Sequence, residues 1–62
     1  MSVNLEERLV ELRNILAECE QDAAKAQSGN KSAGVRFRKA LQAVINTSKE
    51  VRKEVLDATS KD

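Results

Sequence analysis

Apolar residues recur along the chain at alternating steps of three and four, which is the spacing of one face of an α-helix. In the first half of the chain, this row consists of Leu5, Leu9, Leu12, Leu16, Cys19, Ala23 and Ala26. In the second half, it consists of Gly34, Phe37, Leu41, Val44, Ser48, Val51, Val55 and Ala58. These are the a and d positions of a heptad repeat abcdefg, so the sequence predicts two helices that pack along this seam in the manner of a coiled coil.

The strongest break in the pattern is the dipeptide Gly29-Asn30, which is typical of a turn. We therefore expect one helix over about residues 4–27 and a second over about residues 32–58. Because the two helices are joined by a short turn, they must run antiparallel. The predicted fold is all-α, an antiparallel two-helix hairpin that occupies residues 1–62 as a single domain.

Polar residues and glycine mark the ends of both predicted helices. Asn4 is suited to cap the start of the first helix, and Asn30 or Ser32 to cap the second. Gly29 suits the left-handed conformation that commonly follows a helix C-terminus.

Folding the chain back at this break pairs the two seams, and small residues such as Ala26 and Gly34 then meet near the turn. Charged residues beside the seam also match, since e positions face e positions and g positions face g positions in an antiparallel pair. The expected attractive pairs are Glu6 with Arg52, Glu20 with Arg38, and Arg8 with Glu54. Exposed pairs contribute less than about 1 kcal/mol each, so we expect them to fix the register more than the stability.

A second apolar stripe lies outside the predicted seam. A lone chain of 62 residues buries little surface, and a single Cys with no His excludes an intramolecular disulfide and an ordinary zinc site. We therefore interpret the stripe as a self-association surface that forms a homodimeric four-helix assembly. Its residues are Val3, Val10, Ala17, Ile45 and Leu56, with Ala24 continuing the row on the first helix. The alternative is that these are scattered surface residues without a role.

Catalytic chemistry has little support in the sequence. His is absent, Cys19 falls in the predicted seam as a small core residue, and the neighbours Glu6 and Glu7 lie on a solvated face. The segment 29–34 lacks the Gly-Lys-Ser/Thr order of a nucleotide-binding loop. We expect no enzyme activity, no cofactor, no metal and no small-molecule substrate. With no signal peptide and no long apolar run, we also expect a cytoplasmic protein without a membrane partner.

Charge is divided into blocks along the chain. The net charge is −4 over residues 1–24, +7 over residues 25–53 and −2 over residues 54–62. Several bases of the middle block belong neither to the seam nor to the expected charge pairs. They are Lys31, Arg36, Lys39, Lys49 and Lys53. One interpretation is a surface that contacts a phosphate backbone. The alternative is that these bases only complement the acids of the first helix.

The run Gly29-Asn30-Lys31-Ser32-Ala33-Gly34-Val35-Arg36-Phe37-Arg38-Lys39-Ala40-Leu41-Gln42 resembles the signature of the bacterial linker-histone-like, chlamydial-type nucleoid protein family. The resemblance covers about residues 28–56, and the chain looks like a short form without the Lys-rich tail of the chlamydial members. It implies DNA binding and nucleoid compaction. By matching position it implicates Lys31, Arg36, Arg38, Lys39 and Arg52.

These observations lead to one functional hypothesis and one alternative. The hypothesis is a homodimeric helical hairpin that binds the phosphates of double-stranded DNA without sequence preference and organises the nucleoid. Its expected DNA-binding residues are Lys31, Arg36, Arg38, Lys39, Lys49, Arg52 and Lys53. The alternative is a homo-oligomeric helical protein-interaction module whose basic surface binds an acidic protein partner.

Overall fold

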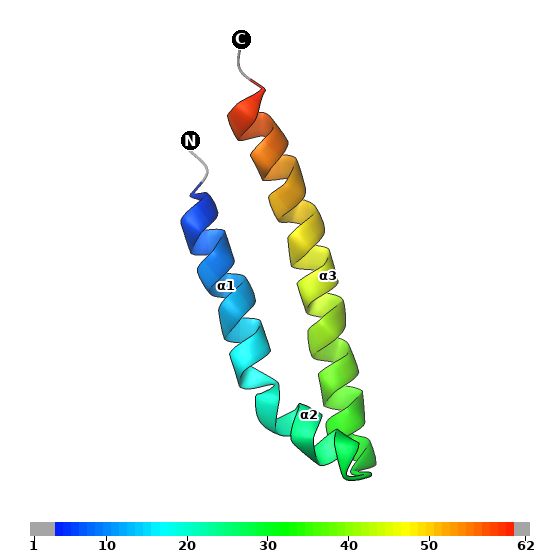
Figure 1. Ribbon diagram of the computed structural model, residues 1–62. Coiled ribbons are helices and arrows are strands. Elements are labelled where there is room, and N and C mark those ends of the chain that lie inside the picture. Colours follow the sequence, from blue (N-terminus) through cyan, green and yellow to red (C-terminus); the bar gives the residue numbers. More distant parts are fainter. Residues whose placement is uncertain (1–3, 61–62) are drawn as a thin grey trace.

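The computed structural model describes residues 4–60, which form three helices in two antiparallel arms (Figure 1). The first arm consists of α1 (Leu5–Glu18) and α2 (Glu20–Gln27), and the second arm is α3 (Lys31–Thr59). Both arms pack against each other, and the described chain begins and ends at the open end of the hairpin (Figure 1). The predicted all-α hairpin is confirmed.

A glycine with a positive φ ends the first arm. Gly29 has a φ of +102°. The backbone N–H groups of Gly29 and Asn30 donate hydrogen bonds to the carbonyl oxygens of Ala26 and Lys25, each at 3.0 Å. This is the Schellman arrangement, which satisfies carbonyl groups that a helix C-terminus otherwise leaves free. The predicted role of Gly29 is confirmed.

Asparagine side chains cap the starts of α1 and α3. The Oδ1 atom of Asn4 accepts a hydrogen bond from the backbone N–H of Glu7 at 3.1 Å. The Oδ1 atom of Asn30 accepts one from the backbone N–H of Ala33 at 3.0 Å. Of the two predicted caps for the second helix, Asn30 is therefore the one that acts, and Ser32 lies within the first turn of α3.

The first arm is bent, so the prediction of one continuous helix over residues 4–27 is wrong at Cys19. This residue has φ −98° and ψ 7°, outside the helical range, and separates α1 from α2. Its Sγ donates a hydrogen bond to the carbonyl oxygen of Leu16 at 3.3 Å. Neither proline nor glycine stands at this point to account for the bend.

The bend coincides with a change in the size of the facing side chains. Near the turn the facing residues are small: Ala33 is fully buried, and a Cβ placed on Gly34 would lie 4.0 Å from the Cβ of Ala26. Farther from the turn, α1 directs the larger Leu12 and Ile15 towards α3. Larger side chains hold α1 away from α3, whereas α2 can close onto the base of α3 (Figure 1).

The contact line between the arms is rotated by one heptad position from the predicted seam. On the first arm the sheltered residues include Leu5, Arg8, Leu12, Ile15, Cys19 and Ala26. On α3 they include Ala33, Phe37, Ala40, Val44, Thr47, Val51 and Glu54. The d positions other than Ala58 are thus confirmed, but the second row is formed mainly by g positions instead of a positions.

Several residues predicted for the seam are instead exposed. Leu9, Leu16, Leu41 and Val55 are 58, 47, 40 and 38 % accessible, and Ala58 is also exposed. The g positions of α3 begin with the small residues Ala33, Ala40 and Thr47, which allow a close approach on that side. The bulkier a positions consequently stand beside the contact line. Within residues 4–60 only Cys19 and Ala33 are buried.

Candidate nucleic-acid interface

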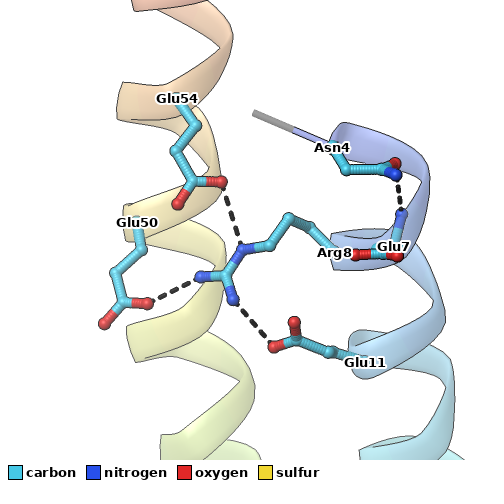
Figure 2. A network of polar contacts seen from close by, with 6 residues as sticks. All are labelled: Asn4, Glu7, Arg8, Glu11, Glu50 and Glu54. Carbon is cyan, nitrogen blue, oxygen red and sulfur yellow. Dashed lines mark hydrogen bonds and ion pairs between the residues drawn. The ribbon is translucent and has the colours of Figure 1, made fainter. Parts of the chain in front are cut away.

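Arg8 connects the two arms near the open end of the hairpin (Figure 2). Its Nε lies 3.1 Å from Oε1 of Glu54, its Nη2 lies 2.7 Å from Oε1 of Glu50, and its Nη1 lies 2.8 Å from Oε1 of Glu11. The predicted pair of Arg8 with Glu54 is confirmed, and the other two partners are additional. The hydrogen bonds that Arg8 donates to Glu50 and then to Glu11 raise its pKa above the ordinary value. Arg8 therefore stays charged throughout the physiological pH range.

Two of the acids that Arg8 binds are neighbours of the basic residues of α3. Glu50 and Glu54 are the acids nearest in sequence to Lys49 and Lys53. Arg8 holds both carboxylates in ion pairs, and the two glutamate side chains reach towards it from α3 (Figure 2). Arg8 thus neutralises part of the negative charge next to the lysines of α3.

Arg36 forms the other ion pair between the arms. Its Nη2 and Nε lie 3.0 and 3.1 Å from Oδ1 of Asp22 on α2. The sequence places Arg36 among the unpaired bases of the DNA surface. The rotated contact line instead sets it beside α2, where it holds the turn end of the hairpin together.

The two expected e-position pairs do not form within residues 4–60, where the ion pairs involve only Arg8 and Arg36 as bases. Glu6 and Glu20 on the first arm and Arg38 and Arg52 on α3 are all exposed. The rotation of the contact line explains the difference, because it moves the e positions of both arms away from each other.

Six of the predicted DNA-binding residues are exposed on α3 and make no ion pair within residues 4–60. They are Lys31, Arg38, Lys39, Lys49, Arg52 and Lys53. Lys39, Lys49 and Lys53 occupy positions f and b, on the side of α3 that faces away from the first arm. We call these three the outer basic row. The other three occupy position e, beside the exposed a positions.

The outer basic row follows the axis of α3. With a rise of about 1.5 Å per residue, Lys39 and Lys53 stand about 21 Å apart. Between them, the side-chain amide of Gln42 donates a hydrogen bond to Asn46 at 3.1 Å, so this stretch is polar but uncharged. The row therefore presents positive charge along one continuous helix.

A shallow hollow of about 340 Å³ lies at the N-terminal end of this row. It is lined by Val35, Arg38, Lys39 and Gln42, all of them from α3. Because one helix supplies the whole lining, the hollow is a surface depression and does not enclose a small molecule. It brings Arg38 and Lys39 together on an open surface.

The described residues offer no other chemical site. Within residues 4–60, no three His, Cys, Asp or Glu residues lie close enough to hold a metal ion. Cys19 is buried, with 5 % of its surface accessible. None of the described helices is long and apolar enough to cross a membrane.

The predicted self-association residues within residues 4–60 occupy positions b and e. Val10 and Ala17 lie at position b of α1, facing away from α3, whereas Ile45 lies at position e of α3, beside the exposed a positions. Leu56 is the most exposed large apolar residue of the described chain, and Val3 lies outside the described residues. Sequence reasoning missed the exposed leucines at position a. The small residues at position g of α3 are the signal that could have revealed them.

Comparison with known proteins adds one result to this geometry. A family model described as "Histone H1-like protein Hc1" matches residues 6–61. The match includes both arms of the hairpin, whereas the motif resemblance covers only the turn and most of α3. No curated protein and no solved structure matches the chain.

Proposed function

The chain belongs to the histone H1-like Hc1 family of chlamydial histone-like proteins, and we propose that it binds duplex DNA through α3. Membership of this family implies DNA binding and nucleoid compaction and not enzyme activity. The proposed contact surface is the outer basic row, Lys39, Lys49 and Lys53. The exposed e-position bases Lys31, Arg38 and Arg52 flank it.

One observation carries this assignment: the outer basic row is exposed and makes no ion pair within residues 4–60, while Arg8 holds the neighbouring Glu50 and Glu54. Bases that served only to balance the first arm would be paired with its acids. Unpaired bases are free to replace the counterions condensed on DNA, and the release of these ions favours binding.

The same surface explains why we propose binding without sequence preference. Lysine side chains contact phosphates as flexible point charges, and such contacts position a protein on DNA without reading its bases. The only aromatic residue, Phe37, points into the contact between the arms and is not available to stack on bases.

The proposal extends to the bacterial nucleoid as the location of the protein and to a homodimer as its working form. Family membership supports the location. The homodimer is supported by the small core, because the hairpin buries only Cys19 and Ala33 within residues 4–60. Folds of this size commonly need a partner subunit to become stable.

Removing single charges tests the proposed surface. Lys39→Gln or Lys53→Gln should weaken binding to every duplex sequence alike and reduce the salt slope by about 0.9 for each phosphate that the variant no longer neutralises. Lys25→Gln is the matched control, because it removes the same charge from α2 and should leave the slope unchanged. Equal effects of all three variants would reject the surface. If poly-glutamate displaced the protein as readily as duplex DNA of equal charge, the acidic-protein alternative would replace the DNA proposal.

A further inference from the structure

Large apolar residues of both arms gather on one side of the hairpin. In an antiparallel pair, the a positions of both helices lie on the same side of the contact line. Leu9 and Leu16 of α1 therefore stand on the same face as Leu41 and Val55 of α3, and Ile45 adjoins them at position e. We call these five residues the apolar face; each has at least 38 % of its surface accessible.

The opposite side of the hairpin is polar. At position c it carries Glu11, Glu18, Arg36, Glu50 and Asp57. Arg8 binds two of these acids, and Arg36 binds Asp22. The hairpin is thus a two-helix layer with one polar face, part of which forms ion pairs, and one face with exposed apolar residues. A layer of this kind buries its apolar residues only when a second layer covers them.

We propose that a second copy of the chain covers the apolar face, so that the two hairpins form an antiparallel four-helix bundle whose two-fold axis runs parallel to the helices. The exposed a positions would then complete a core that the d positions begin inside each hairpin. This inference rests on the self-association proposed above and replaces the b-position stripe with a different surface.

The e positions identify a second copy as the occupant. They line the edges of the apolar face and include four residues whose charges are opposite on the two arms, Glu6 and Glu20 on the first arm and Arg38 and Arg52 on α3; Arg13 and Lys31 are the other charged e positions. None of the four forms an ion pair within residues 4–60. In an antiparallel bundle, each helix uses its g positions towards one neighbour and its e positions towards the other. Arg8 and Glu54 already use the g side within the chain.

The register of the hairpin sets these charges at matching heights. The ion pairs Asp22–Arg36 and Arg8–Glu50 connect the two arms with the same offset in residue number, and the other contacts lie within about one helical turn of it. By the same offset, Glu20 is level with Arg38, and Glu6 is level with Arg52. A two-fold axis parallel to the helices preserves height, so each glutamate of one copy faces its level arginine on α3 of the second copy.

The other way of stacking two apolar faces is disfavoured by charge. A two-fold axis perpendicular to the helices would place α3 against α3 and invert the heights. For centred copies, Arg38 would then approach Arg52 of the second copy, and Glu6 would approach Glu20. Like charges at close range repel, so the parallel axis is the arrangement that the sequence favours.

The bundle would also determine how DNA is held. The two α3 helices would occupy diagonally opposite corners, and their outer basic rows would point away from each other. One bundle could then contact two duplexes and bridge them. Arg38 and Arg52 would serve the protein interface, leaving Lys39, Lys49 and Lys53 for phosphates.

Neighbouring residues provide a matched test of the face. Sedimentation without DNA should show a dimer for the unmutated chain at micromolar concentration. Leu9→Glu should raise the dimer dissociation constant by about a hundredfold or more, because two unpaired carboxylates would be buried. Val10→Glu places the same charge on the outer side of α1 and should leave the dimer intact. A monomeric unmutated chain, or dissociation by Val10→Glu but not Leu9→Glu, would overturn the proposal.

An exchange of the e-position charges between the two arms tests the direction of the two-fold axis. The test remains informative if one variant fails to fold alone. The variant Glu6→Arg/Glu20→Arg and the variant Arg38→Glu/Arg52→Glu should each dimerise poorly, because like charges would meet wherever position 6 or 20 of one copy faces position 52 or 38 of the other. Mixed in equal amounts, they should form a heterodimer and regain helicity by circular dichroism. A mixture no more associated than its components would refute the arrangement. Because DNA is absent, failure here leaves the DNA proposal standing, and failure of DNA binding leaves the bundle standing.

Discussion

Gly34 faces Ala26 across the closest part of the hairpin, and a Cβ on Gly34 would lie 4.0 Å from the Cβ of Ala26. That separation is an ordinary van der Waals contact, so the site has room for a methyl group. Gly34→Ala should therefore stabilise the protein by about 0.5–1 kcal/mol, since glycine costs roughly that much inside a helix. Chemical denaturation followed by circular dichroism measures the change. A loss of stability would mean that the arms approach more closely than this distance indicates.

Gly29→Ala should have the opposite effect. The positive φ of Gly29 is a conformation that residues with a Cβ adopt at a cost of about 1–2 kcal/mol. No atom lies within 4 Å of the added Cβ, so backbone strain and not a clash would be the cause. The same denaturation measurement, with Gly34→Ala as the comparison, should show changes of opposite sign. An unchanged stability would contradict the left-handed turn.

The cap of α3 gives a third test. Asn30→Ala removes the side-chain acceptor for the backbone N–H of Ala33 and should cost about 1 kcal/mol. Ser32→Ala alters an exposed residue of the same turn and should change stability by about a few tenths of a kcal/mol at most. Thermal unfolding of both variants separates these expectations. Equal losses would show that Ser32 shares the capping role.

Arg8→Gln should lower the melting temperature and reduce DNA affinity, although Arg8 does not belong to the outer basic row. The substitution removes three ion pairs and frees Glu50 and Glu54 beside the lysines of α3. The melting-temperature loss should shrink at high salt, because ions screen exposed pairs. Arg13→Gln removes the same charge from a residue without an ion pair within residues 4–60 and should have the smaller effect on both measurements. Equal effects would refute the role of Arg8 in neutralising the acids next to the lysines.

The turn could be predicted because its determinants are local. Gly29 and Asn30 act through their own backbone and side chain, so their identity is sufficient to indicate a helix end and a helix start. The bend at Cys19 has no such local signal. It arises where small residues in α2 let the arms close, and this depends on the facing residues of α3.

The seam was predicted only in part, since heptad spacing shows which residues share a face but not how many helices surround them. In a four-helix core, the a and d positions are both sheltered from solvent. In the two-helix contact of this hairpin, the d positions and the neighbouring g positions are sheltered, and the large residues at the a positions are exposed. Leu9 and Leu16 therefore satisfy the sequence pattern and are still exposed in the single hairpin.

The rotation of the contact line between the arms changes the surroundings of only some of the predicted DNA-binding residues. Arg36 forms an ion pair with Asp22, which lies level with it on α2. Arg38 does not form the expected pair with Glu20. The lysines at positions f and b face away from the first arm in either rotation. Their exposure could therefore be predicted from the sequence, and the pairing of the arginines could not.

The most direct test of the central claim is the affinity of the unmutated protein for duplex DNA at several salt concentrations. Fluorescence anisotropy with two duplexes of different sequence should give binding constants that fall linearly with salt on logarithmic axes. If Lys39, Lys49 and Lys53 each neutralise one phosphate, the slope should be about −2.7 or steeper per chain, because each phosphate contributes about −0.9. Both duplexes should give the same line. Absence of binding at low salt, or an affinity that does not change with salt, would contradict the assignment of α3 as a DNA-binding surface.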